Sequence, residues 1–190
     1  MDPDRFERVE VTSDAALWEW LGHHYGRTDS VWLVTWKAAH QDRYVSREAV
    51  LDALIAHGWI DGRRLKLDEA RTMQLISPRR QQAWAQSYKT RAARLQAERR
   101  MHPAGVAAFE EGKRSGRWHE SDPVDALRDP DDLVKAIEAH GAKAWWQMTA
   151  PSYRRNVLRW IATAKRPETR RARIETVAEA AGKREKVPQY

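Results

Sequence analysis

The chain has 190 residues, of which 42% are hydrophobic and 32% are charged, so it can fold around a buried core and is not intrinsically disordered. It contains no cysteine, which excludes disulfides, thiol chemistry and cysteine-ligated zinc sites. Its formal net charge of +7 favours acidic partners such as nucleic acid or small anions.

The first part of the chain alternates between helical and extended patterns. Ser13 has the position of an N-cap residue before an apolar helical segment, which Gly26 ends. Ser46 has the same position before a second helix, which ends at Gly58. Between them, residues 31–37 are β-branched and aromatic on both faces, and this pattern indicates a covered strand.

A β-hairpin is predicted next, over residues 59–79. Its apolar positions agree across the loop when Leu65 pairs with Leu75. The same register places Asp61 opposite Arg79. This register predicts why an acid can lie on an otherwise apolar strand face. The charge of Asp61 is expected to be neutralised by Arg79 on the neighbouring strand.

Beyond the hairpin every pattern is helical. Pro103 suits the first turn of one helix, and residues 129–132 combine a cap, a proline and two acids at the start of another. We therefore expect an α+β protein, mostly helical, with a small antiparallel sheet of about three strands. Residues 1–120 are expected to form an N-terminal α+β domain with the hairpin. Residues 121–190 are expected to form a C-terminal helical segment that packs on this domain as one unit.

Five sequence motifs occur in a fixed order along the chain: GWIDG (58–62), SPRR (77–80), the tryptophan at 84, RMHPAGVAAFEEGKRSGRW (100–118) and AKRPETRRARI (164–174). Together they resemble the YdeI/OmpD-associated family, also called bacteriocin-protection proteins, over residues 17–183. The resemblance implies a bacterial cytoplasmic protein that is linked to resistance against bacteriocins and envelope stress and has no established reaction. Family members usually carry serine and asparagine around the tryptophan, where this chain has Ala83, Ala85 and Tyr88.

The hairpin supplies the first candidate ligand site: Trp59, Asp61, Arg79, Arg80 and Trp84. One interpretation is structural, with Asp61 and Arg79 as an ion pair that fixes the strand register. A second is functional, with Arg79 or Arg80 binding an anion through two parallel hydrogen bonds. Acid–base catalysis by Asp61 is a third, but no second carboxylate or histidine lies at a telling spacing. We therefore predict no catalytic residue, and an enzyme of unknown class ranks last.

A second candidate site lies in the C-terminal part, where positive charge is densest. Its residues are Lys165, Arg166, Arg170, Arg171 and Arg173. Clustered arginine and lysine side chains can bind the phosphates of nucleic acid, which makes a nucleic-acid-binding protein the alternative function. An acidic protein or a small anion could also bind there, and so could acids elsewhere in this chain.

The rest of the sequence bears on metal binding, cofactors and cellular location. No metal site is expected, because His23 and His24 point to different helix faces and no HExxH motif occurs. No cofactor is expected either. The amino-terminal sequence lacks an apolar signal segment, and no run of about 18 apolar residues could span a membrane, so a cytoplasmic location is expected. We predict a non-enzymatic binding or stress-resistance protein.

Overall fold

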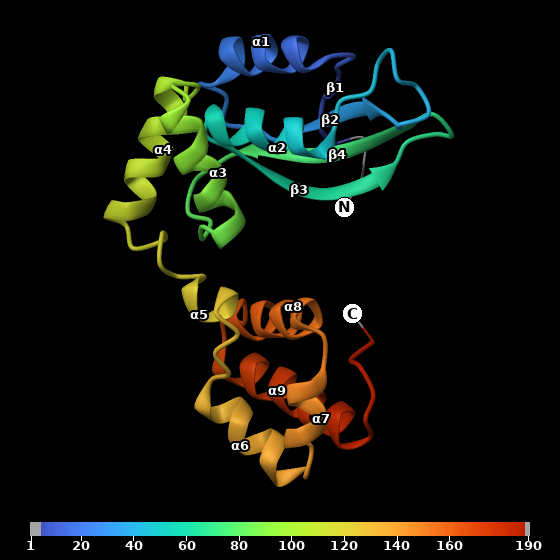
Figure 1. Ribbon diagram of the computed structural model, residues 1–190, viewed down its shortest axis with the longest axis vertical. Helices are drawn as coiled ribbons and strands as arrows, with labels where there is room; N and C mark the ends of the chain where they lie inside the picture. Colours follow the sequence, from blue (N-terminus) through green and yellow to red (C-terminus); the bar gives the residue numbers. More distant parts are fainter. Residues whose placement is uncertain (1–4, 189–190) are drawn as a thin grey trace. The chain divides into compact units, whose positions relative to one another are not determined.

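The structure is a computed structural model that describes residues 5–188, and the chain divides into two compact units after Glu120 (Figure 1). Within the described residues, the first unit contains four strands and four helices, and the second contains five helices. The predicted α+β class is confirmed. Each unit is described here by itself.

The first unit is built on a sheet that α-helices cover. Its elements in chain order are β1 (Arg8–Glu10), α1 (Asp14–His24), β2 (Val31–Trp36), α2 (Arg47–Ala56), β3 (Trp59–Lys66), β4 (Arg71–Pro78), α3 (Gln86–Ala97) and α4 (Pro103–Arg114). The N-caps predicted at the first two helices are confirmed. The Ser13 hydroxyl accepts from the Ala16 N–H at 3.1 Å, and the Ser46 hydroxyl accepts from the Ala49 N–H at 3.0 Å.

The sheet has the strand order β1-β2-β4-β3, so the prediction of three antiparallel strands was wrong. β1 pairs with β2 in parallel, and the other pairs are antiparallel. β1 escaped sequence analysis because it has three residues, of which Val9 alone is buried, too few to show an alternating pattern. The connection from β1 to β2 runs through α1, as a parallel pair requires a crossover.

The predicted register of the hairpin was also wrong. Asp61 lies opposite Ile76, and Leu65 lies opposite Met73. Arg79 comes after the end of β4, so no strand pairing brings it to Asp61. Its backbone N–H donates to the Gly58 carbonyl oxygen at 2.8 Å, where the chain enters β3.

Two features explain the difference. The hairpin loop begins earlier than predicted, with Lys66 opposite Thr72, and β3 also contains a β-bulge. The pairing shifts between Asp61 and Arg64, so that two residues, Gly62 and Arg63, are opposite Leu75 alone. The bulge reverses which side chains point to which face, so Asp61 and Leu65 lie on opposite faces of the sheet although both are odd-numbered. The acid therefore does not share the face of the leucines.

The two faces of the sheet carry separate apolar clusters. Figure 1 shows α1 and α2 over the same face. The cluster on that face includes Leu17, Leu21, Val31, Leu33, Leu54, Trp59 and Ile76. The cluster on the other face consists of Trp32, Val34 and Met73 with Phe6, Leu65, Leu67 and Leu75 around them.

The contact between α2 and α4 is close because a glycine lies in it. A Cβ atom on Gly105 would lie 2.0 Å from the carbonyl oxygen of Ala56, far inside van der Waals distance. Further along α4, a Cβ on Gly112 would lie 2.3 Å from the Trp84 indole nitrogen. These two glycines let α4 pack against α2 and against Trp84.

His57 ends α2 in a buried position and is expected to make folding pH-dependent. Its Nδ1 lies 2.8 Å from the Ala53 carbonyl oxygen, and its ring packs edge-on against Trp18 and stacks on His102. Burial lowers its pKa from 6.5, and the nearby His102 lowers it further, while the bond to Ala53 acts in the opposite direction. Because the unfolded chain then binds the proton more readily, the free energy of unfolding is expected to decrease as pH falls from 6.5 through the lower folded pKa.

Urea denaturation between pH 7.5 and pH 5 measures this pH dependence. His57→Gln cannot titrate but keeps a donor for Ala53, so it is expected to flatten the dependence. An unchanged slope in His57→Gln would assign the pH dependence to another group.

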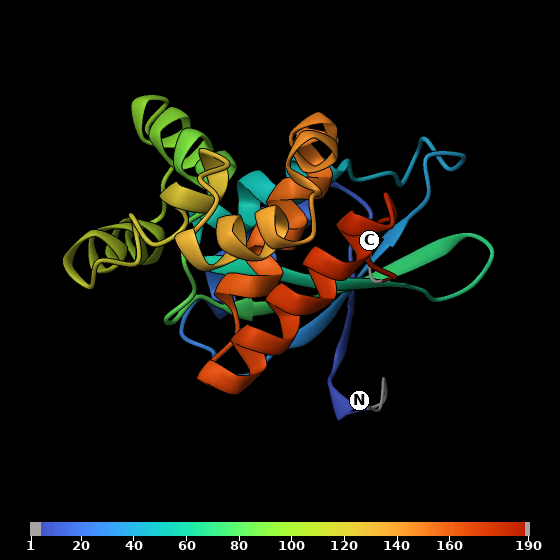
Figure 2. The ribbon, with the colours of Figure 1, turned by 90° about the horizontal axis from the view of Figure 1, so that it is seen from below.

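The second unit is an all-helical bundle. Its elements are α5 (Asp122–Asp125), α6 (Asp131–Ala139), α7 (Lys143–Met148), α8 (Pro151–Ala162) and α9 (Pro167–Gly182). Figure 2 shows α9 lying against α8 and α6, and the core between them includes Leu133, Ile137, Val157, Ile161, Ile174 and Val177.

A partly buried ion pair links the start of α6 to α8. The Arg154 guanidinium donates to Asp129 at 2.9 Å, and the Trp146 indole N–H donates to the same carboxylate oxygen at 2.9 Å. Both charged side chains are 17% exposed. In the part of the chain that the structure describes, no helix combines the length and the apolar character that crossing a membrane requires.

Candidate functional site

The Asp61 carboxylate is held by neutral donors and not by the predicted arginine. It accepts hydrogen bonds from the Gln74 side-chain amide, at 3.0 Å, and from the Tyr88 hydroxyl. The carbonyl oxygen of the same amide accepts from the Arg64 guanidinium at 2.6 Å. β3, β4 and α3 therefore each contribute to one polar chain, which runs from Arg64 through Gln74 and Asp61 to Tyr88.

Arg79 lies on the aromatic rings beside this chain. Its guanidinium carbon is 4.0 Å from the centroid of the Trp84 ring and 5.3 Å from that of Tyr88. One of its nitrogens donates to the carbonyl oxygens of Gln82 and Ala83, at 3.1 and 3.3 Å. The other two nitrogens are buried and find no hydrogen-bond partner within residues 5–188.

Burial lowers the pKa of Arg79 to about 10, although the neighbouring Tyr88 and Asp61 act in the opposite direction. Burial also raises the pKa of the Tyr88 hydroxyl, and its hydrogen bond to Asp61 raises it further. At neutral pH Tyr88 is therefore a phenol that donates to Asp61, while its ring supports the Arg79 cation. Asp61, Gln74, Arg79, Trp84 and Tyr88 are called the Asp61 cluster below.

The structure brings together three of the five residues predicted for this site. Asp61, Arg79 and Trp84 belong to the Asp61 cluster. Trp59 is fully buried in the core under α1 and α2. Arg80 is exposed and donates to the Thr28 carbonyl oxygen at 2.8 Å, away from the cluster.

Sequence reasoning missed Gln74 and Tyr88. Gln74 lies between two apolar residues of β4, so it fits the alternating pattern of a strand whose polar side chains face solvent. The pattern therefore does not indicate that Gln74 lies under the helices and binds Asp61. Tyr88 stands where the YdeI/OmpD-associated pattern has asparagine, so that pattern does not predict a hydroxyl donor to Asp61. Within residues 5–188, no three histidine, aspartate or glutamate side chains are grouped so that they could hold a metal ion.

A small cavity of about 250 Å³ opens next to Tyr88, between α2 and α3. It is lined by Arg47, Glu48 and Leu51 from α2 and by Ser87, Tyr88 and Arg91 from α3. We call it the α2–α3 cavity.

Positive charge is in excess around the α2–α3 cavity. Arg91 is already paired with Glu48 and with Asp52, the latter at 2.8 Å. Burial lowers the pKa of Arg91, and the like charges of Arg94 and Arg47 lower it further, so these guanidinium groups lie close enough to repel each other. Arg47 forms no hydrogen bond or ion pair with any residue that the structure describes.

The basic cluster of the second unit is partly used within that unit. Arg170 forms two bonds of 2.8 Å to the Asp132 carboxylate, and Arg173 donates to the carbonyl oxygen of Trp160. Both arginines therefore join α9 to neighbouring helices. The other predicted residues, Lys165, Arg166 and Arg171, are exposed.

Two family models match the chain. Residues 9–108, more than half of it, match a domain of unknown function, DUF8412. Residues 127–183 match the family described as bacteriocin-protection, YdeI or OmpD-associated. The predicted resemblance is thus confirmed in the second unit, whereas the GWIDG and SPRR motifs lie in the part that matches DUF8412. No curated protein and no solved structure matches the chain.

Proposed function

Since the chain belongs to the DUF8412 family, we propose its function from its own side chains: it is a non-enzymatic binding protein that takes a small anion in the α2–α3 cavity. The observation that carries the proposal is Arg47, which has no counter-ion among residues 5–188 and lines the same cavity as a second arginine, Arg91. An anion bound at Arg47 would supply the counter-charge that this arginine lacks, while Arg91 keeps its pairs with Glu48 and Asp52.

The chemistry of the lining residues supports a single negatively charged group. The guanidinium of Arg47 and the hydroxyl of Ser87 are available as donors, because neither has a partner within the described residues. The Tyr88 proton is donated to Asp61, so Tyr88 contributes its ring as a wall of the cavity.

The Asp61 cluster has a positioning role in this proposal. Asp61 accepts from two donors, which holds Tyr88 in one orientation at the cavity wall. A carboxylate engaged in this way orients its neighbours and is poorly placed to remove a proton from a ligand. This supports binding in preference to a reaction.

The cellular role that we propose is resistance to bacteriocins or envelope stress in the bacterial cytoplasm. Its support is the match of residues 127–183 to the bacteriocin-protection family. We do not extend the proposal to nucleic acid, because Arg170 and Arg173 already bind groups of the second unit.

Inorganic phosphate is expected to stabilise the first unit, and Arg47→Ala is expected to weaken its binding about tenfold or more, the effect of losing one charged hydrogen bond. Thermal unfolding at increasing phosphate concentration measures this. A ligand at 100 times its Kd stabilises the folded state by about 2.7 kcal/mol.

Two controls separate specific binding from ionic strength. Sodium chloride at matched ionic strength is expected to leave the midpoint of unfolding nearly unchanged. Arg43→Ala removes an exposed arginine that pairs with Asp42 at 3.1 Å, so it is expected to keep the full response to phosphate. An equal response of Arg47→Ala and the unmodified protein would exclude the α2–α3 cavity as the anion site.

A further inference from the structure

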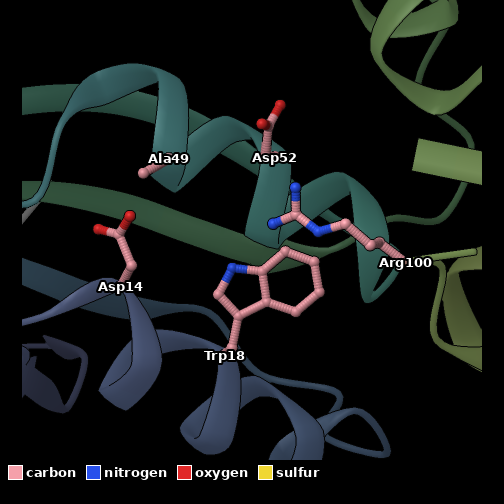
Figure 3. A pocket seen from close by; sticks show the side chains of 5 residues that line it. All are labelled: Asp14, Trp18, Ala49, Asp52 and Arg100. Carbon is pink, nitrogen blue, oxygen red and sulfur yellow. The ribbon is translucent and has the colours of Figure 1, made fainter. Parts of the chain in front are cut away.

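A second and larger cavity, of about 580 Å³, lies between α1 and α2 on the first unit. Figure 3 shows its lining residues: Asp14, Trp18, Ala49, Asp52 and Arg100. We call it the Trp18 cavity, because the Trp18 indole lies at its centre. Cavities of about 300–1,000 Å³ are typical of sites for small ligands.

Opposite charges lie on two sides of the indole. In Figure 3 the Asp14 carboxylate lies on the side of the indole nitrogen, and the Arg100 guanidinium lies beside the six-membered ring. The guanidinium carbon of Arg100 is 4.9 Å from the centroid of the Trp18 ring, so this cation is held on the aromatic surface. The cavity is therefore an aromatic surface with an acid at one end and a base at the other.

The acid at one end is available to a ligand. Asp14 is exposed in the first turn of α1 and forms no ion pair or hydrogen bond with any of residues 5–188. Asp52, the other carboxylate of the cavity, is 15% exposed and is paired with Arg91 and Arg94. A ligand cation would therefore bind at Asp14.

The base at the other end is half-exposed and is held in place. Arg100 pairs with Glu98 at 3.2 Å and is 48% exposed. No other hydrogen bond or ion pair of this guanidinium lies within residues 5–188, which leaves donors for a second carboxylate. Trp18 is itself partly buried and packs edge-on against His57, which fixes the indole between the two charges.

We propose that the Trp18 cavity binds a short peptide with free ends, with the peptide amino group at Asp14 and the carboxylate at Arg100. An anion alone would bind Arg100 but be repelled by Asp14. A cation alone would bind Asp14 but be repelled by Arg100. A zwitterion satisfies both charges at once, and a chain of two or three residues separates its charges by roughly the length of an indole, at about 3.3 Å per extended residue. This site is independent of the α2–α3 cavity.

Titration of the full chain with tri-alanine, followed by ¹H–¹⁵N NMR, tests the proposal. Each of the 10 tryptophans gives an indole N–H signal, and Trp18→Phe identifies the one that belongs to Trp18. That signal is expected to shift and to saturate with tri-alanine. N-acetylated tri-alanine and tri-alanine amide are each expected to bind at least tenfold more weakly.

Single substitutions assign each peptide end to its residue. Asp14→Asn is expected to weaken binding of tri-alanine at least tenfold and to leave binding of the N-acetylated peptide unchanged. Arg100→Gln is likewise expected to weaken binding of tri-alanine at least tenfold. It is expected to leave binding of tri-alanine amide, which has no carboxylate, unchanged. Glu19→Gln, a neutralised exposed acid on the same helix, is the matched control and is expected to bind like the unmodified protein.

Two outcomes would overturn the proposal. One is a Trp18 signal that does not saturate with tri-alanine at millimolar concentrations. The other is equal affinity for the free and the N-acetylated peptide, which would mean that Asp14 does not recognise an amine.

Discussion

Gly105→Ala is expected to destabilise the first unit by about 3 kcal/mol, at the upper end of the cost of overpacking a core. The new methyl group would lie 2.0 Å from the Ala56 carbonyl oxygen, 2.6 Å from its carbon and 3.0 Å from the Ile55 carbonyl oxygen. All three atoms belong to the backbone, so no side chain can rotate away. α4 must instead move off α2, which also opens the packing of α4 against Trp84.

Urea denaturation followed by circular dichroism measures the loss. Gly22→Ala is the matched control, because it adds the same methyl group to a helix where the nearest atom, on His57, is 4.0 Å away. It is expected to stabilise the protein by up to about 1 kcal/mol through helix propensity alone. Equal stabilities for the two variants would contradict the close contact between α2 and α4.

The second large effect is expected from Asp129→Ala, at about 3–5 kcal/mol in the stability of the second unit. The substitution leaves the Arg154 guanidinium without its counter-ion at a position where this side chain is 17% exposed. The Trp146 indole N–H loses its acceptor at the same time. A partly buried charge that loses its counter-ion costs more than the hydrogen bonds it formed, because it stays desolvated.

Hydrogen exchange of the amides in α6 to α9 reports on this unit selectively. Glu138→Ala is the control, because it removes an ion pair with Lys143 whose side chains are 45% and 61% exposed. Exposed pairs contribute about 1 kcal/mol or less. Protection that is lost equally in both variants would show that Asp129 has no special role.

Much of the fold could be predicted from local chemistry. The caps at Ser13 and Ser46, the start of α4 at Pro103 and the left-handed Gly58 all follow from one or two residues and their immediate neighbours. Such features need no knowledge of the rest of the chain. They were predicted correctly for that reason.

The features that were missed depend on partners far along the chain. The bulge divides β3 into two segments whose pairings with β4 are out of step by one residue, and the alternation of the sequence does not show where this step lies. One of the two donors to Asp61 is Tyr88 on α3, 27 residues away, and this contact follows only from the placement of α3 beside the sheet. The α2–α3 cavity depends in the same way on how two helices lie against each other.

The bulge in β3 also has a consequence for how this protein can vary. Up to Asp61, odd-numbered side chains of β3 lie under the helices, and from Arg64 onward even-numbered ones do. Deleting one bulge residue would bring the strand into a single phase, so either the Asp61 carboxylate or the leucines at 65 and 67 would change faces. Homologues are therefore expected to keep the length between Trp59 and Leu65, while insertions accumulate in the loop before β4. In β3, substitutions are therefore expected to be tolerated more readily than insertions or deletions.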